Sequence, residues 1–141
     1  LDWHIADHPQ RRALQDYIAE LGRLYKETPA LWRNDPEPSS FEWIDCSDKD
    51  NTILSYLRRD GADHAIVVLN FTPVPRDEYR IGVPSAGRYI ERLSSDDLRY
   101  GGSEFQTTSV VEADPVPLHG RPFSIRLRIP PLGALILTPA R

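Results

Sequence analysis

The chain has 141 residues, of which 40% are hydrophobic and 27% charged, and its formal net charge is −4 at pH 7. This length allows one domain, or one domain with a piece of another, and a core that needs no disulfide staples. The acidic balance argues against a general nucleic-acid binder and against an anionic membrane surface as a partner.

An amphipathic helix is predicted over residues 7–27. Apolar side chains recur there at the i, i+3, i+4, i+7 spacing of one buried stripe, namely Leu14, Tyr17, Ile18, Leu21 and Leu24 or Tyr25. Asp7 is the expected N-cap, and Pro9 fits the first turn, where its missing N–H is not needed. Thr28-Pro29 ends the helix, because the residue before a proline is pushed out of the α region.

A domain boundary is predicted after the helix, since prolines and serines crowd residues 29–40. From Phe41 onward the hydrophobic period changes from 3.6 to 2. We expect strands near residues 41–46, 52–59, 64–71, 79–83, 87–93, 105–112, 123–129 and 133–138. Short strands joined by turns, with no helix between them, indicate a mainly β fold: an antiparallel β-sandwich preceded by one α-helix.

The helix needs a partner, because it has one apolar stripe and the chain offers no second helix. Either it packs against the sandwich or it belongs to a larger body upstream. The chain begins at Leu1 and contains no methionine, which favours the second alternative and a piece of a longer polypeptide. On that view residues 1–30 are expected to be mobile by themselves, since an isolated helix of this length is marginal in water.

No catalytic or metal-binding constellation is evident. An acidic cluster follows the first predicted strand: Asp45, Asp48, Asp50 and Asn51. It fails the EF-hand pattern, because Ile53 and Arg59 stand where that pattern requires glycine and glutamate. We interpret it as a solvated turn. None of the 21 acids has the apolar setting that tunes a glycosidase carboxyl, so we expect no catalytic residue. Because no metal-ligand pattern is complete, we expect no metal, and no motif implies a cofactor.

Aromatic side chains are the candidates for ligand contact, because ring faces suit the apolar faces of glucose. Trp43, Tyr56 and Tyr100 are the rings considered for this role. Each ring would equally suit the core or a contact between domains, since aromatic side chains bury a large area. Arg76, Arg99 and Arg121 are predicted in loops, where they could contact another domain or a glycan hydroxyl or form part of a charged solvent face. Their spacing does not decide between these alternatives.

Ordered motifs run along nearly the whole chain. They are Leu21-Gly22-Arg23-Leu24-Tyr25 with Thr28-Pro29-Ala30-Leu31, Phe41-Glu42-Trp43-Ile44-Asp45-Cys46, Leu54-Ser55-Tyr56-Leu57-Arg58-Arg59, Asn70-Phe71-Thr72-Pro73-Val74-Pro75-Arg76 with Tyr79-Arg80-Ile81-Gly82-Val83-Pro84, Tyr100-Gly101-Gly102-Ser103, His119-Gly120-Arg121-Pro122 and Pro130-Pro131-Leu132-Gly133-Ala134. In this order and spacing they resemble the C-terminal part of bacterial 1,4-α-glucan (glycogen) branching enzymes, members of the α-amylase superfamily.

The resemblance implies a layout and a function. Residues 1–34 would be the last helix of a (β/α)8 barrel with its linker, and residues 35–141 an amylase-type C-terminal sandwich. Enzymes of this family cleave α-1,4-glucan chains and transfer them to form α-1,6 branches in glycogen. Their catalytic acids lie in the barrel, so none maps onto this chain, whose implied role is to stabilise the barrel and hold glucan. The implied partners are the barrel of the same polypeptide and α-1,4-glucan or glycogen.

Two alternatives stay open beside this interpretation. The chain could instead be an independent glucan-binding module in which Trp43, Tyr56 or Tyr100 stacks on sugar, or the same domain from a debranching or trehalose-forming relative. A cytoplasmic location is expected, because the single cysteine, Cys46, allows no disulfide within the chain.

Overall fold

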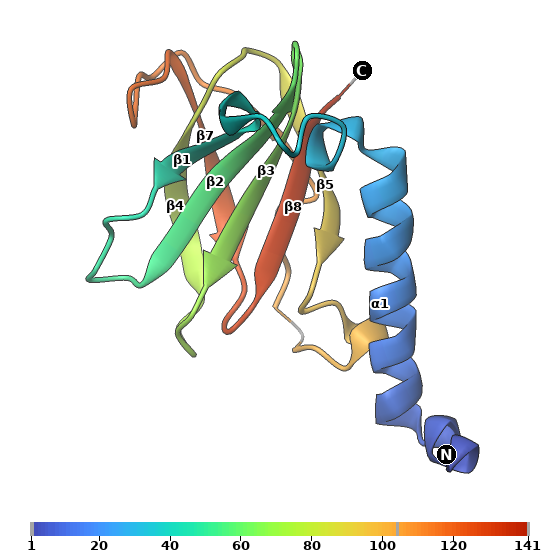
Figure 1. The fold of residues 1–141 in the computed structure, drawn as a ribbon. Helices are drawn as coiled ribbons and strands as arrows, with labels where there is room; N and C mark the ends of the chain where they lie inside the picture. Colours follow the sequence, from blue (N-terminus) through green and yellow to red (C-terminus); the bar gives the residue numbers. More distant parts are fainter. Residues whose placement is uncertain (1, 104, 141) are drawn as a thin grey trace.

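The computed structural model describes residues 2–103 and 105–140, whose strands form two sheets (Figure 1). The strands are β1 (Phe41–Asp45), β2 (Ile53–Asp60), β3 (Asp63–Asn70), β4 (Arg76–Val83), β5 (Arg88–Ser94), β6 (Val110–Glu112), β7 (Phe123–Ile129) and β8 (Ala134–Pro139). One sheet has the order β1-β2-β3-β8-β5-β6, and β4 pairs with β7 in the other. All of these strand pairs are antiparallel, which confirms the predicted mainly β sandwich.

The predicted strands are all present, and two of them differ from prediction by more than one residue at an end. β4 begins earlier than predicted, at Arg76, across an irregularity in its register with β7. β6 is confined to three residues, because side chains rather than a partner strand hold the segment before it. There the Thr107 hydroxyl donates to Glu91, and the Thr108 hydroxyl accepts from the Arg128 backbone N–H.

The core lies between the two sheets and follows the alternation of the strands. On β7, Ile125, Leu127 and Ile129 are buried in it, whereas Arg126 and Arg128 point away. β3 is paired on both sides, with β2 and β8, as expected for its apolar run. Each fully buried Ile or Leu contributes about 1.5–3 kcal/mol relative to exposure, so this alternation stabilises the sandwich.

The helix α1 (Pro9–Glu27) follows a short 3₁₀ helix, η1 (Trp3–Asp7). The predicted end at Thr28-Pro29 is confirmed, and Pro9 occupies the first helical position. The predicted N-cap is wrong, because His8 holds that position. Asp7 instead ends η1, where its carboxylate lies 3.1 Å from the Arg12 guanidinium.

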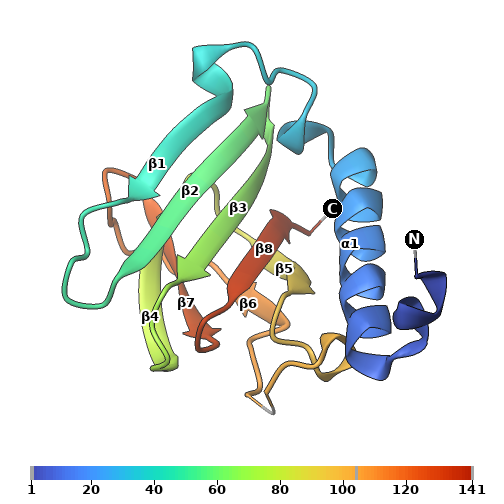
Figure 2. The ribbon, with the colours of Figure 1, turned by 60° about the horizontal axis from the view of Figure 1, so that its bottom comes forward.

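α1 lies along the outer face of the six-stranded sheet, beside β8 (Figures 1 and 2). Leu24 is 1% exposed and packs with Val67, Leu93 and Ile136 of that face, and Tyr17 and Leu21 add to this cluster. The helix thus has a partner within the chain, and the expected mobility of residues 1–30 stays a prediction.

Only half of the predicted apolar stripe is covered by this packing. Leu14, Ile18 and Tyr25 are 59%, 58% and 47% exposed. We call these three side chains the exposed row of α1. The sandwich is thus a partner for one flank of the helix, and the other flank faces solvent.

The segment between helix and sandwich is folded onto β2. It contains the 3₁₀ helices η2 (Pro29–Leu31) and η3 (Pro38–Ser40). Arg33 and Asn34 both bind the Asp60 carboxylate, at 2.7 and 2.9 Å, and Asp35 pairs with Arg58. The division of the chain into residues 1–34 and 35–141 stays a prediction.

Candidate functional sites

Three aromatic rings meet on the outer face of the sheet, at its β1 edge. Trp43 and Tyr56 are direct cross-strand partners, with ring centroids 6.1 Å apart and planes at 86°. Phe41 lies 5.0 Å from the Trp43 ring and 5.2 Å from the Tyr56 ring. Because Phe41 and Trp43 are 39% and 48% exposed, these rings form an accessible aromatic surface. Phe41, Trp43 and Tyr56 are called the aromatic cluster below.

Arg121 supports the aromatic cluster from within the chain. Its Nη2 donates to the Trp43 carbonyl oxygen at 3.2 Å and pairs with the Glu42 carboxylate. It follows a two-residue hairpin turn, His119-Gly120, in which both residues have positive φ, as a type I′ turn requires. Arg121 is 6% exposed and bound within the chain, so the structure favours neither of the alternatives left open for it, a solvent face or a contact with another domain or a glycan.

Tyr100 lies apart from the aromatic cluster, at the end of η4 (Leu98–Tyr100). Its ring is 5.3 Å from that of Tyr17 on α1, and the Arg99 guanidinium lies 5.1 Å from it. A Cβ on Gly102 would come within 2.0 Å of the Asp96 carbonyl oxygen, so the loop that follows requires glycine there. This glycine-rich motif therefore folds a loop that holds Tyr100 against the helix.

The side chain of Asn70 holds together the motif that runs from Asn70 to Arg76. Its side-chain amide donates to the carbonyl oxygens of Val74 and Pro130, at 2.9 and 2.8 Å. Its carbonyl oxygen accepts from the backbone and hydroxyl of Thr72. Asn70 is 3% exposed and joins the β3–β4 connection to the end of β7.

The acidic turn after β1 is held by its own hydrogen bonds. Asp48 accepts from Asn51 and, at 2.5 Å, from the Tyr79 hydroxyl. Burial favours a higher pKa of Asp48, but these hydrogen bonds outweigh it and hold the pKa below its ordinary value. Within residues 2–103 and 105–140, no group of three His, Cys, Asp or Glu side chains is placed to hold a metal ion.

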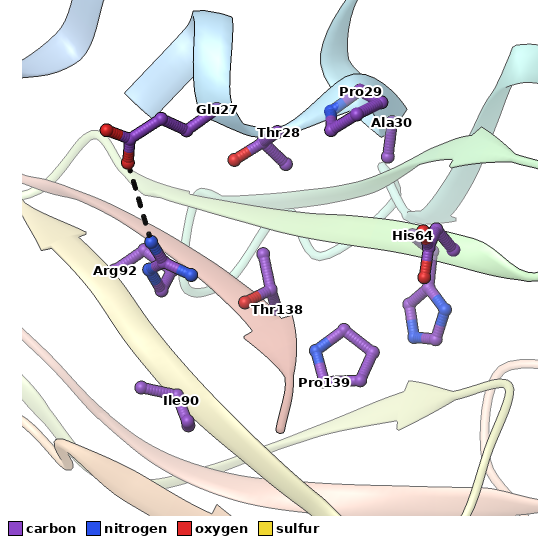
Figure 3. Close-up of a pocket in the computed structure, with 10 residues that line it drawn as sticks. Glu27, Thr28, Pro29, Ala30, His64, Ile90, Arg92, Thr138 and Pro139 are labelled. Atoms are coloured by element: carbon purple, nitrogen blue, oxygen red, sulfur yellow. Dashed lines mark ion pairs between the residues drawn. The ribbon is translucent and has the colours of Figure 1, made fainter. Parts of the chain in front are cut away.

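A pocket of about 250 Å³ lies where the end of α1 and η2 meet the sheet (Figure 3). We call it the junction pocket. Glu27 and Thr28 line it from the helix side, and His64, Arg92 and Thr138 line it from β3, β5 and β8. Sequence analysis missed it, because these residues are far apart in the chain and belong to no motif.

His64 is the most buried ionisable group of the junction pocket, at 4% exposed. Its Nε2 lies 3.0 Å from the Tyr89 hydroxyl, which also donates to the Ser85 carbonyl oxygen at 3.2 Å. Burial lowers the pKa of His64 and raises that of Tyr89, so both groups are held in their neutral forms. His64 therefore forms part of the wall and supplies no charge to the pocket, whereas Tyr89 lies behind it in the core.

No helix in the described part of the chain is both long and apolar enough to cross a membrane. Cys46 is exposed and has no disulfide partner.

A family model described as alpha amylase, C-terminal all-beta domain, matches residues 43–140. A 1,4-alpha-glucan branching enzyme GlgB of Rubrobacter xylanophilus is 48% identical over 141 residues, which are 99% of this chain and 19% of that protein. Its namesake in Salinibacter ruber is 47% identical over 140 residues, 99% of this chain and 22% of that protein. The chain thus spans about a fifth of the length of these curated relatives. A solved α-amylase from H. orenii is 14% identical, with a TM-score of 0.49 over 83% of this chain and 18% of its own.

Proposed function

This chain belongs to the alpha-amylase C-terminal all-beta domain family, and on that basis we propose that it is the non-catalytic C-terminal domain of a 1,4-α-glucan branching enzyme. The observation that carries the proposal is the identity of 47–48%, over 99% of this chain, to two proteins of that name. The longer enzyme cleaves α-1,4-glucan chains and transfers them to form α-1,6 branches. The names of these relatives favour a branching enzyme over a debranching or trehalose-forming one.

The proposed partner is a barrel domain of the same polypeptide, which this chain stabilises. The exposed row of α1 supports this, because Leu14, Ile18 and Tyr25 lie on the helix flank away from the Glu27–Arg92 pair. The row and the aromatic cluster together leave apolar surface of the kind that contacts between domains cover.

Substitutions in the exposed row test the barrel contact. In this chain alone, Leu14→Gln and Ile18→Gln are expected to change the free energy of unfolding by no more than about 0.5 kcal/mol, because both side chains face solvent. In the longer enzyme each is expected to cost about 1.5–3 kcal/mol, since the side chain is then buried. Thermal melting of both proteins measures the difference.

Ala19→Gln is the matched control, because Ala19 is exposed on the opposite flank of α1 and is expected to be neutral in both proteins. A second experiment removes residues 35–141 from the longer enzyme. An enzyme that keeps its melting temperature and branching activity after this truncation contradicts the proposal, as do equal effects of the row substitutions in both proteins.

The second candidate function is glucan binding by the aromatic cluster, and the exposure of Trp43 is the observation that favours it. Rings that stack on sugar are expected to contribute about 1–3 kcal/mol each, by analogy with stacking on bases. Trp43→Ala and Tyr56→Ala should therefore weaken the binding of maltoheptaose, measured by calorimetry. Tyr100 stays a predicted contact, although its packing on Tyr17 makes Tyr100→Ala a test of the loop as well.

Trp32→Ala is the control for the aromatic cluster, because Trp32 is 38% exposed and contacts Arg33, outside that cluster. Binding that is unchanged in both Trp43→Ala and Tyr56→Ala removes this candidate. The C-terminal domain proposal does not depend on the outcome.

We also propose a cytoplasmic location. Cys46 is exposed and unpaired, and a free surface thiol is typical of a reducing compartment. Fractionation of cells that express the longer enzyme tests this proposal, and recovery outside the cytoplasm contradicts it.

A further inference from the structure

The junction pocket is small and has both apolar and polar walls. Pro29, Pro139 and Ile90 supply apolar surface, and Thr28, Thr138 and Arg92 supply hydrogen-bonding groups (Figure 3). Its volume of about 250 Å³ lies below the range of about 300–1,000 Å³ typical of sites for drug-sized ligands. The pocket therefore suits one ring and not a stretch of polymer.

Two threonine hydroxyls are available to a ligand in this pocket. Thr28 and Thr138 are 8% and 9% exposed as residues, and they lie on the helix side and the sheet side respectively. Neither hydroxyl has a hydrogen-bond partner among the described residues, and neither is sealed from solvent. Each hydroxyl can donate one hydrogen bond and accept two, which is the capacity that a ligand hydroxyl matches.

The charged groups of the pocket are mixed in sign. Arg92 Nη2 lies 3.9 Å from Glu27 Oε2, at the limit of an ion pair, and the two side chains are 39% and 46% exposed. Such an exposed pair contributes little, so the Arg92 guanidinium can turn to a ligand without a large loss. The Glu27 carboxylate is held elsewhere, because it accepts from Arg23 Nη1 at 2.9 and 2.7 Å. Because Glu27 and Asp63 oppose Arg92 in the lining, the pocket does not favour a phosphate or carboxylate ligand.

We propose that the junction pocket binds one neutral sugar ring, the end glucose residue of an α-1,4-glucan chain. The Thr28 and Thr138 hydroxyls bond ligand hydroxyls from opposite walls, while the Arg92 guanidinium donates to a neighbouring ligand hydroxyl. The choice of glucose rests on the proposed function, whereas the preference for a neutral polyhydroxyl ring rests on the pocket itself. Bound sugar would also join the end of α1 to β8, because the two hydroxyls belong to these elements.

An NMR titration with maltotriose tests the proposal. In the uniformly ¹⁵N-labelled chain, millimolar maltotriose is expected to give saturable shifts at the amides of Glu27, Thr28, Ala30, His64 and Thr138. The double substitution Thr28→Val with Thr138→Val keeps the side-chain shapes and removes both hydroxyls. It is expected to weaken binding about tenfold, the combined effect of two ordinary hydrogen bonds.

A second variant tests the pocket even if the double valine variant is unstable. Arg92 is more exposed than the two threonines, and Arg92→Met removes the guanidinium but keeps an unbranched apolar stem. This variant should weaken binding in the same direction even where the double valine variant melts early. Arg126→Met is the matched control for Arg92→Met, because Arg126 is an exposed arginine on β7, outside the lining of the pocket. It is expected to leave the shifts at the pocket unchanged.

The outcomes separate this inference from the proposed function. Unchanged affinity for maltotriose in the folded double valine variant overturns the proposal that the junction pocket binds sugar. Tighter binding of inorganic phosphate than of maltotriose overturns it as well. Shifts confined to Phe41, Trp43 and Tyr56 overturn sugar binding in the junction pocket but support sugar binding by the aromatic cluster. The absence of any shift overturns both sugar sites and leaves the C-terminal domain proposal to its own truncation test.

Discussion

At the scale of single residues, Glu91 is a side chain whose environment fits its charge poorly. It lies on β5 beside a register irregularity, and its Oε1 accepts the Thr107 hydroxyl at 2.8 Å. Its Oε2 is buried and has no hydrogen-bond partner among the described residues. Burial raises the pKa of Glu91, because the ionised carboxylate is poorly solvated there.

This arrangement predicts a pH-dependent gain from Glu91→Gln. A carboxyl whose pKa is raised in the folded state contributes full stability below its unfolded pKa, and that stability is lost as the pH rises through the folded pKa. Removing the charge should therefore raise the free energy of unfolding at pH 7 by about 1 kcal/mol. The gain should vanish by about pH 4, where the unfolded carboxyl is also protonated.

Urea unfolding at the two pH values measures the effect, with Glu78→Gln at an exposed position of β4 as the control. A loss of stability in Glu91→Gln at pH 7, or an equal gain at both pH values, contradicts this explanation. The sequence analysis found no acid in an apolar setting and so missed Glu91. The sequence does not reveal which glutamate a strand irregularity turns inward.

At the scale of elements, the sequence predicted what depends on local pattern. The strict alternation from Phe123 to Ile129 was sufficient to place β7, and Thr28-Pro29 was sufficient to end α1. The length of β6 was not predictable, because Thr107 and Thr108 divert that segment into side-chain hydrogen bonds with distant strands.

The candidate sites depend on register and on packing, which local pattern does not contain. Trp43 and Tyr56 were both chosen from the sequence, but their pairing across β1 and β2 and the contribution of Phe41 follow from the register. Tyr100 was chosen with them and lies elsewhere, against Tyr17. The junction pocket combines residues 27–30 with residues 138–139, a separation beyond any sequence motif.

At the scale of the whole molecule, α1 and the sandwich are expected to unfold as one unit. Leu24 is the most buried side chain of the helix and lies among Val67, Leu93 and Ile136 of the sheet. Leu24→Ala should therefore cost about 2–5 kcal/mol, the usual range for truncating a buried leucine. Leu14→Ala, at a position 59% exposed on the same helix, should stay within about 0.5 kcal/mol.

Thermal melts followed by far-UV circular dichroism and by tryptophan fluorescence should coincide in the parent chain and shift together in Leu24→Ala, as two-state unfolding requires. This result would mean that residues 1–34 are energetically part of the sandwich, even though we propose the exposed row as their contact with a barrel. Separate transitions, with the helical signal lost first and the sandwich unaffected by Leu24→Ala, would instead support a boundary near residue 35. The helix would then depend on the longer polypeptide, and not on the sheet, for its stability.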